Sequence, residues 1–391
     1  MKTVYLDHAA TTPVDPRVKQ EMDKYYSEVF GNPGSFHSFG LEAKDAIEDA
    51  RARVATIFHS KPLEVIFTGS GTESVNLAIL GVAKGYKHKG NHIITTKAEH
   101  HAVLHSCEFL QKEGYNVTFL PVGKDGIVNP KDVEAAITDK TILVSIMYAN
   151  NEIGTINPIK EIGEICKAKK VLFHSDACQA AGALDINVEN LNVDLLSING
   201  SKLYGPKGVG ALFVKQGTQL KPVIHGGGQE RDLRSGTEDV PAIRGLTKAL
   251  ELAQEEKETE NIRLTRLRDY LIANILKTIP KTRLNGHATK RLPNNVNISF
   301  MDIEGEALIL YLNEYGICVS TGSACTSKTL DPSHVILALG VPFETAHGSV
   351  RFTLGKSSTK EGMDHVLKVL PDVIKKLRAI SPVNVRPELY A

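Results

Sequence analysis

The sequence has little cysteine, almost no excess charge and no long hydrophobic run. Its five cysteines are an odd number among 391 residues and form no CxxC pair, so neither a disulfide framework nor a structural zinc site is predicted. The net charge of +1 argues against a surface that binds nucleic acid, which needs a basic excess. No window approaches the ~18 apolar residues of a membrane span, and no signal peptide is expected because an acid interrupts the N-terminus before an apolar run can build. These absences favour a cytoplasmic protein with reduced thiols.

Short apolar runs alternate with helical patterns through the first two-thirds of the chain. The predicted strands are residues 65–68, 92–96, 117–120, 142–147, 171–176 and 193–198, and helices between them include residues 74–81 and 159–169. The hydrophobic content of 42% is ordinary for a chain that buries a core. Alternation of this kind predicts an α/β fold with a mostly parallel sheet, and ligands bind such sheets at the carboxyl ends of the strands.

The composition changes near Ala253. A run of charged residues there is followed by apolar residues at helical spacing, Leu264, Leu267, Leu271 and Ile275. This spacing predicts a long amphipathic helix that leads into a second domain and uses its apolar side for packing. We therefore predict a large domain over residues 14–255 and a smaller α/β domain made of residues 1–13 and 256–391.

A lysine and an aspartate follow two of the predicted strands. Lys202 lies between the strand at 193–198 and a Gly-Pro turn, where its amine is well placed to lose its proton and act as a nucleophile. Asp176 ends the strand at 171–176. A cofactor such as pyridoxal 5'-phosphate (PLP) needs both groups, a lysine to form the Schiff base and a carboxylate that keeps the pyridine nitrogen protonated. The alternative is two unrelated surface charges, because most lysines are solvated.

A glycine-rich turn follows the strand at 65–68 and opens a helix. Its sequence, Thr-Gly-Ser-Gly-Thr-Glu over residues 68–73, combines glycines that let an anion approach the backbone with the free N–H groups of a helix start. A phosphate is the natural ligand for this arrangement, and the Thr72 hydroxyl adds a donor. A simple loop is the alternative, because a lone glycine-rich turn is a common feature.

Three histidines cluster after the strand at 92–96. His101 and His105 are four residues apart and could share a helical face as metal ligands, but no third ligand has suitable spacing. His100 could instead lie over a flat cofactor ring and exchange protons with a substrate, or it could be structural. Asn151 follows another predicted strand, where its amide could donate to a cofactor or shape a turn.

Cys325 lies in a segment of small and polar residues, Ser-Thr-Gly-Ser-Ala-Cys-Thr-Ser over residues 320–327. Cysteine is usually buried, so this setting predicts an exposed, reactive thiol that could act as a nucleophile and collect sulfur. The other cysteines have apolar or helical neighbours and are interpreted as inert. Among them, Cys178 is expected to face away from Asp176 and Gln179, which share one side if the chain turns helical after the strand.

Taken in their order along the chain, these segments resemble the motifs of the NifS/IscS-type cysteine desulfurases. The resemblance runs nearly the full length of the chain. The matching segments are Tyr5–Pro13, Gly31–Pro33 with His37, the turn at Thr72, Glu99–His100, Asn150–Gly154, Asp176–Gln179, the Lys202 segment, His225–Thr237 and Ser323–Ser327. Any one of them is modest evidence, whereas the ordered set is specific. The resemblance implies a fold-type-I PLP-dependent transferase of the class-V aminotransferase family, working as a homodimer whose two active sites lie near the subunit interface.

The resemblance also implies a role for each matched residue. The cofactor-binding residues would be Lys202, which holds PLP, Asp176 at the ring nitrogen, His100 on the ring face, Asn151 and Gln179 at the phenolate side, and Gly71, Thr72, Asn199, Ser201 and Thr237 at the phosphate, the last from the neighbouring subunit. Arg351, with Asn151 beside it, would bind the substrate carboxylate through bidentate hydrogen bonds. Asn199 and Ser201 depart from the family, which usually has serine and histidine there, so the phosphate is expected to be held differently.

The implied reaction removes sulfur from L-cysteine. Lys202 and His100 would move protons, Cys325 would take up the sulfur as a persulfide, and L-alanine would be released. The persulfide would pass to an acceptor such as an iron–sulfur scaffold or a tRNA-thiolation enzyme. No intrinsic metal is expected, although Cys325 could transiently ligate a cluster on a partner. The alternatives are another fold-type-I PLP enzyme, such as an aminotransferase or a selenocysteine lyase, and a non-catalytic sulfur-relay protein.

Overall fold

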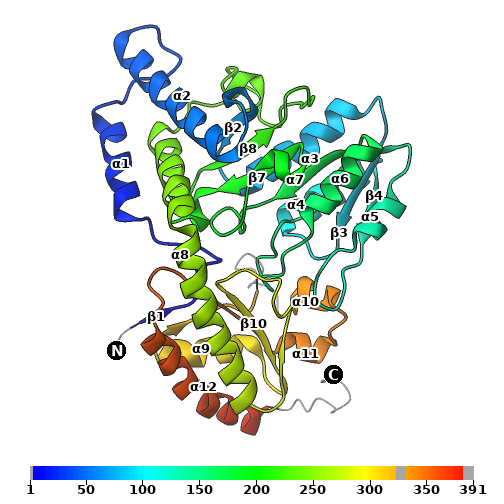
Figure 1. Cartoon of the computed structure of the whole chain (residues 1–391), viewed down its shortest axis with the longest axis vertical. Helices are drawn as coiled ribbons and strands as arrows, with labels where there is room; N and C mark the ends of the chain where they lie inside the picture. The colour runs from blue at the N-terminus through cyan, green and yellow to red at the C-terminus, as the bar shows by residue number, and fades with distance from the viewer. Residues whose placement is uncertain (1–2, 323–330, 382–391) are drawn as a thin grey trace.

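The structure is a computed structural model that describes residues 3–322 and 331–381. Two packed bodies lie one above the other along the longest axis, and the long helix α8 (Val240–Thr278) runs beside both (Figure 1). The upper body contains the larger sheet, and the lower body contains a smaller sheet. The site described below lies where these two bodies meet.

Among the described residues, the larger sheet has seven strands in the order β2-β8-β7-β6-β5-β3-β4. They are β2 (Val65–Thr68), β3 (His92–Thr96), β4 (Asn116–Leu120), β5 (Thr141–Ser145), β6 (Leu172–Asp176), β7 (Leu195–Asn199) and β8 (Gly210–Val214). Strands β3 to β7 pair in parallel, whereas β8 is antiparallel to both β7 and β2. The predicted α/β fold with a mostly parallel sheet is confirmed, and β8 is a strand that the apolar runs did not predict.

Helices cover both faces of this sheet. One face is covered by α3 (Gly71–Tyr86) and α4 (His101–Lys112). The other is covered by α1 (Pro16–Ser27), α2 (Ser38–Phe58), α5 (Pro130–Ala136), α6 (Ile159–Lys169), α7 (Val188–Leu191) and the first half of α8. Neighbouring strand residues point to opposite faces, so Ile93 and Leu143 pack on the first face while Ile94 and Val144 pack on the second. Strands buried on both sides therefore read as continuous apolar runs in the sequence.

A separate hydrophobic core lies in the lower body. The elements of this body are β9 (Thr282–Leu284), β10 (Asn295–Phe300), β12 (Ser349–Thr353), the parallel pair β1 (Val4–Tyr5) and β11 (Ile317–Cys318), and the helices α9 (Gly305–Glu314), α10 (His334–Ala338), α11 (Phe343–His347) and α12 (Lys360–Ile380). Helices α10 and α11 pack in a separate small cluster with Ala98 and Ile153. As the helical spacing predicted, α8 buries Leu264, Leu271 and Ile275 in the core of the lower body. The helix begins earlier than the charged run, at Val240, because the Asp239 side chain caps its first turn. Within the described ranges, no helix is both long and apolar enough to cross a membrane.

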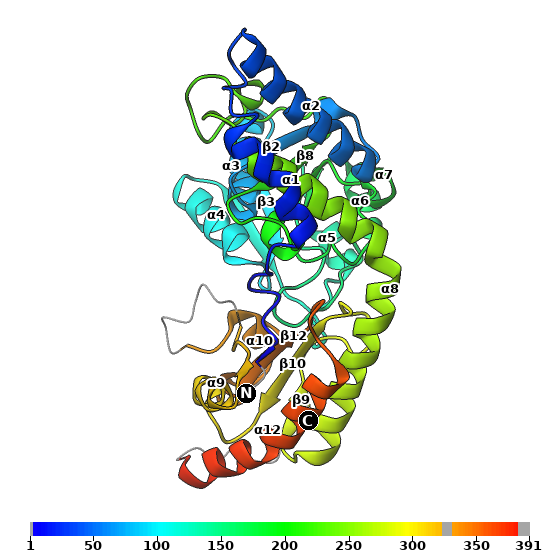
Figure 2. The ribbon, with the colours of Figure 1, turned by 90° about the vertical axis from the view of Figure 1, so that its left-hand side faces the viewer.

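The N-terminal segment joins the two bodies. It begins in the lower body, where β1 pairs with β11. It then crosses to the upper body, where the Thr12 N–H donates to the Ser201 carbonyl (2.9 Å), and Figure 2 shows this crossing in dark blue below α1. The crossing brings the carbonyl of Ala9 to Gln179 (3.0 Å) and the carbonyl of Ala10 to Lys202. Residues 9–12, for which no strand was predicted, therefore lie beside the carboxyl ends of β6 and β7.

Candidate active site

A cavity of ≈ 170 Å³ lies at the carboxyl ends of β6 and β7. It is lined by Ala9, Ala10, Gly71, Thr72, His100, Ala102, Met147, Asn151, Asp176, Cys178, Gln179, Asn199, Lys202 and Arg351. The carboxyl ends of neighbouring parallel strands meet at one edge of the sheet, so residues far apart in the chain gather there. The structure thereby brings most of the predicted site residues together.

Lys202 and Asp176 enter this cavity from adjacent strands. Lys202 ends the short 3-10 helix η2 (Gly200–Lys202) that follows β7, and its Nζ donates a hydrogen bond to the carbonyl of Ala10. Asp176 is the last residue of β6 and is buried. Its Oδ1 accepts a hydrogen bond from the Cys178 N–H (2.9 Å). A buried carboxylate and an amine that line one cavity are the pair that a pyridine nitrogen and a covalent attachment require.

Cys178 lines the same cavity, so the expectation that it faces away from Asp176 and Gln179 is wrong. Residues 178–183 form turns, and the helical spacing used for that expectation does not apply to them. Burial raises the pKa of the Cys178 thiol well above its usual value, and the Asp176 carboxylate raises it further. The thiol is therefore protonated at neutral pH, which agrees with its interpretation as an inert residue.

The start of α3 forms one end of the cavity. Ser70 caps the helix with its side chain, and Gly71 and Thr72 follow along the cavity wall. A Cβ atom on Gly71 would lie 2.6 Å from the Cys178 Sγ, so a side chain there would close the helix start. The Asn199 Oδ1 is shielded from solvent and has no hydrogen-bond partner among the described residues. A phosphate fits this end, because the helix start offers N–H groups and an amide can be turned to donate.

Two predicted site residues lie away from this lining. Ser201 directs its carbonyl to Thr12, which donates through its N–H (2.9 Å) and its Oγ1 (3.1 Å), and its side chain does not join the described cavity wall. Thr237 is exposed and follows the 3-10 helix η3 (Glu230–Asp232). Cys325 lies outside the described residues.

Arg351 enters the cavity from β12. It is among the largest fully buried side chains, at 1% exposure. Its Nη2 donates to the Asp7 Oδ1 (2.9 Å), and its Nη1 donates to the Asn151 carbonyl (2.9 Å). A buried guanidinium with N–H groups to spare is suited to a carboxylate ligand. Asp7 was not predicted as a site residue, since its only signal in the sequence was membership of the opening motif.

His101, His105 and His334 meet next to His100, which lines the cavity. His100 caps α4, where its Nδ1 accepts a hydrogen bond from the Ala102 N–H (3.1 Å). The His101 ring centroid lies 4.9 Å from that of His105 and 4.5 Å from that of His334. Burial, followed by the neighbouring imidazoles, lowers the pKa of His101 to about 4. Within residues 3–322 and 331–381, no group of three or more histidine, cysteine or acidic side chains is placed to hold a metal ion.

Glu99 is a buried carboxyl beneath the cavity. Both of its oxygens accept from the Met147 N–H (3.0 and 3.1 Å), and its Oε1 also accepts from the Thr96 Oγ1 (3.0 Å). Burial raises the pKa of Glu99 to about 8, and the Asp176 carboxylate nearby raises it as well. Glu99 is therefore mostly protonated at neutral pH, while it holds the end of β5 against β3.

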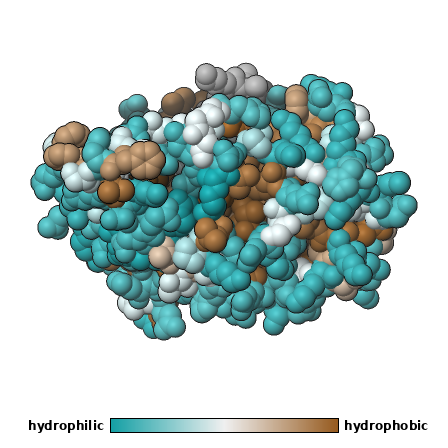
Figure 3. All heavy atoms as spheres, turned by 90° about the horizontal axis from the view of Figure 1, so that it is seen from above, coloured by the Kyte–Doolittle hydropathy of each residue, from teal (hydrophilic) through white to brown (hydrophobic). Residues whose placement is uncertain are grey.

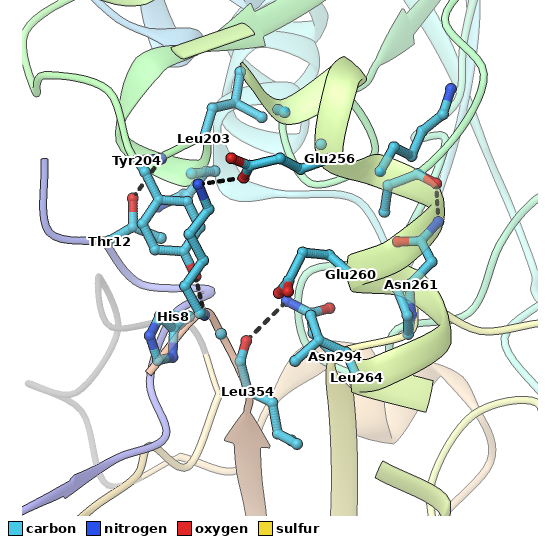
Figure 4. A pocket seen from close by; sticks show the side chains of 18 of the residues that line it. His8, Thr12, Leu203, Tyr204, Glu256, Glu260, Asn261, Leu264, Asn294 and Leu354 are labelled. Carbon is cyan, nitrogen blue, oxygen red and sulfur yellow. Dashed lines mark hydrogen bonds and ion pairs between the residues drawn. The ribbon is translucent and has the colours of Figure 1, made fainter. Parts of the chain in front are cut away.

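A second cavity, of ≈ 90 Å³, lies between the two bodies and shares Lys202 and Gln179 with the first. Figure 4 shows Tyr204 on one side of it and Glu256 of α8 on the other. The Lys356 Nζ crosses this junction to Glu256 (2.6 Å). The ion pair between Lys356 and Glu256 therefore forms part of the wall of the second cavity and connects α8 to the lower body.

The sequence profile of the class-V aminotransferases matches residues 4–366. The chain belongs to this family. Among curated relatives, the cysteine desulfurase IscS of Clostridium botulinum (strain Kyoto / Type A2) is 54% identical over 384 residues, which cover 98% of this chain and 97% of the relative. The cysteine desulfurase IscS of Methanosarcina thermophila is 54% identical over 383 residues, which cover 98% and 95%.

Solved structures of other proteins share this architecture. A NifS-like protein superposes with a TM-score of 0.90 at 39% identity, over 96% of this chain and all of that one (100%). SspA, solved in complex with cysteine, gives a TM-score of 0.80 at 35% identity, over 90% of this chain and 99% of that one. The predicted resemblance to NifS/IscS-type cysteine desulfurases is confirmed, and so is the fold-type-I α/β class.

Proposed function

We propose that this class-V aminotransferase is a PLP-dependent cysteine desulfurase, which converts L-cysteine to L-alanine and retains the sulfur as a persulfide on Cys325. The observation that carries the proposal is the meeting of Lys202, Asp176 and Arg351 in one cavity of a chain that is 54% identical to curated cysteine desulfurases. An amine nucleophile, a buried carboxylate and a guanidinium are the groups that PLP chemistry on an amino acid needs.

The residue types that line the cavity are those that PLP binding requires. When bound, PLP supplies an electron sink for the α-carbon of an amino acid. The residues that would hold it are Lys202 at the covalent attachment, Asp176 at the ring nitrogen, His100 on the ring face, Asn151 and Gln179 at the phenolate side, and Gly71, Thr72 and Asn199 at the phosphate. Ser201 would support the phosphate end through the backbone of η2, because its carbonyl is tied to Thr12.

The residues around the substrate bind it and move its protons. Arg351 binds the carboxylate of L-cysteine through its guanidinium, with Asn151 beside it. The Lys202 amine takes the proton from the α-carbon, and the Ala10 carbonyl that accepts from its Nζ keeps the amine within reach of the cavity. His100 lines the same cavity and acts as the second acid–base group.

Cys325 accepts the sulfur atom of the substrate. Its thiolate attacks the sulfur of L-cysteine, so that an S–S bond forms and the C–S bond breaks. The electron pair of the broken bond stays with the β-carbon, which takes up a proton and becomes the methyl group of L-alanine, and the Lys202 amine returns a proton to the α-carbon. The persulfide then passes to an acceptor protein, such as an iron–sulfur scaffold or a tRNA-thiolation enzyme. We place this chemistry in the cytoplasm, where thiols stay reduced.

We further propose that the protein works as a homodimer. Aromatic and aliphatic side chains are exposed around the loop between α1 and α2, at Tyr26, Phe30, Phe36, Phe39 and Leu41. Figure 3 looks onto this end of the molecule and shows apolar side chains within a mostly hydrophilic face. Large exposed apolar groups favour a protein interface. In the dimer, the exposed Thr237 would reach the phosphate of the neighbouring active site.

Separate hydrophobic cores in the upper and lower bodies support a division into two domains. We propose that residues 14–255 form the large domain and that residues 1–13 and 256–391 form the small one. Val18 packs in the core beneath the larger sheet, whereas Leu6 packs in the lower core. Helix α8 is continuous across the proposed boundary. Any movement of one domain relative to the other must therefore bend this helix or shift it against one of the domains.

The proposal is tested by mapping persulfide on the purified holoenzyme after L-cysteine is added. We expect an adduct of about 32 Da, one sulfur atom, on Cys325. Cys325→Ala should keep the absorbance of bound PLP and lose sulfide production, while Cys318→Ala should retain both, since Cys318 is a half-buried thiol away from the cavity lining.

Lys202→Ala should abolish the attachment of PLP that borohydride reduction makes permanent. Sulfide production by Cys325→Ala would contradict the desulfurase mechanism. Amino-group transfer by that variant would instead favour an aminotransferase, and failure of borohydride to attach PLP to the native chain would favour a non-catalytic sulfur carrier.

A further inference from the structure

The positively charged side chain of Arg351 is buried, and it already binds a carboxylate of this chain. A buried guanidinium is costly unless it is paired. Within the described part of the chain, the one ion pair of Arg351 is with Asp7, whose Oδ1 lies 2.9 Å from Nη2. Asp7 therefore neutralises the arginine that faces the cavity.

This pairing leaves part of the guanidinium for a ligand. Its Nη1 donates to the Asn151 carbonyl (2.9 Å), and its Nε is shielded from solvent without a partner among the described residues. A guanidinium has five N–H donors in a planar fork, and Asp7 accepts through Oδ1 from Nη2. A second carboxylate can approach the same group beside the first.

The backbone holds Asp7 in place. Its carbonyl accepts hydrogen bonds from the N–H groups of Ala10 (3.0 Å) and Thr11 (3.4 Å) and from the Tyr5 hydroxyl (3.1 Å). Asp7 also pairs with Thr353 of β12 in an isolated parallel bridge. Because Arg351 lies on the same strand, the carboxylate stays beside the guanidinium when a ligand arrives.

We infer that Asp7 is a fixed counter-ion that weakens the hold of Arg351 on the carboxylates of substrate and product. The inference rests on the proposed function, in which Arg351 binds the carboxylate of L-cysteine. Two carboxylates on one guanidinium repel each other and share its donors, so an amino acid binds less tightly than it would to an unpaired arginine. L-Alanine carries the same carboxylate, so the same weakening speeds its release. Asp7 is a positioning residue, because it acts through Arg351.

The test compares Asp7→Asn with the native holoenzyme. Asparagine keeps an oxygen that can accept from Arg351, and it removes the negative charge. We expect the Kd of L-alanine, measured by isothermal titration calorimetry, to fall about tenfold, the scale of one hydrogen bond to a charged group. The KM for L-cysteine should fall in the same direction. Asp7→Glu, which keeps the charge, should retain the native affinity.

Two controls separate this effect from a general disturbance. Cysteamine, which is L-cysteine without its carboxylate, should bind the native protein and Asp7→Asn equally. Asp269→Asn should leave L-alanine binding unchanged, since Asp269 also pairs with a buried arginine, Arg268 (2.8 Å), on α8 and outside the cavity lining. The absorbance of bound PLP and the thermal midpoint show whether each variant is folded.

Unchanged or weaker binding of L-alanine to Asp7→Asn would overturn the inference, as would an equal change for cysteamine. Tenfold tighter binding to Asp7→Glu would overturn it too, because the charge is still present. If the native holoenzyme binds neither L-cysteine nor L-alanine, the proposed function fails. If the native protein binds both and Asp7→Asn binds them equally well, only the inference about Asp7 fails.

Discussion

Glu230→Gln should destabilise the body that contains the larger sheet by about 3–5 kcal/mol, the typical cost of removing one partner from a buried ion pair. The Glu230 side chain is 1% exposed and that of its partner Arg51 is 4% exposed. The two contacts between them are 2.7 and 2.8 Å long. The Phe67 N–H also donates to the Glu230 Oε2 (2.8 Å), so the same carboxylate ties β2 to this pair.

The pair also holds a strained turn. Glu230, Arg231 and Asp232 have φ angles of 47°, 57° and 63°, in the left-handed region that costs a non-glycine residue roughly 1–2 kcal/mol. Strain of this kind persists only where surrounding contacts enforce it. Since the turn leads to Thr237, Glu230→Gln should also reduce the retention of PLP in the proposed dimer.

The thermal unfolding midpoint of the holoenzyme measures the effect. In a domain of this length the midpoint falls by roughly 2–4 °C for each kcal/mol, so a decrease of roughly 6 °C or more is expected. Glu251→Gln is the matched control. Its carboxylate makes the same two-point contact to Arg53, at 2.6 Å for both hydrogen bonds, but the two side chains are 19% and 33% exposed. Its loss should cost about 1 kcal/mol or less.

Equal decreases for the two variants would refute the argument, because burial is the property that distinguishes the pairs. The double variant Arg51→Met with Glu230→Met removes both charges and leaves apolar groups of similar volume. It should recover most of the lost stability. A double variant as unstable as Glu230→Gln would show that the instability does not come from a buried Arg51 that has lost its buried partner and, within the described ranges, keeps only the exposed Glu48 (3.2 Å) as an ion-pair partner.

Two further predictions concern the cavity. Burial raises the pKa of Glu99 from 4.5 to about 8, so the folded protein keeps a proton that the unfolded chain releases above pH 4.5. The free energy of unfolding should therefore fall as the pH rises from 4.5 towards 8, and Glu99→Gln should remove most of this fall in denaturant titrations. Gly71→Ala should lower the PLP content seen by absorbance, because its Cβ would lie 2.6 Å from the Cys178 Sγ and overpacking costs about 1–3 kcal/mol. Gly123→Ala, whose Cβ would meet its nearest neighbour at 3.5 Å, should bind PLP normally.

Much of the larger sheet could be predicted because its signals are local. β3 and α6 have the predicted bounds, His92–Thr96 and Ile159–Lys169, since apolar runs and helical spacing are properties of neighbouring residues. Local signals also put Asp176 and Lys202 at the ends of strands. Parallel strands present their carboxyl ends at one edge, so a ligand site at that edge could be expected without knowledge of side-chain contacts, whereas the adjacency of β6 and β7 is known only from the structure.

Contacts between distant segments could not be predicted in the same way. His334 joins His101 and His105 from α10, although nothing near His334 in the sequence indicates such a contact. Cys178 faces the cavity because the chain after β6 turns instead of forming a helix, and turns leave no periodic pattern. The antiparallel strand β8 went unpredicted, since its place in the sheet depends on pairing with β2 and β7.

The sequence by itself determined which side chains can do the chemistry: an amine and a carboxylate at strand ends, a glycine-rich helix start and an arginine on a late strand. The tertiary structure alone decided that Asp7 neutralises that arginine, Arg351, across a separation of 344 residues. The physical reason is burial. The pair forms only when the N-terminal segment crosses between the two bodies and packs against β12, because that packing removes the water that would otherwise solvate both charges.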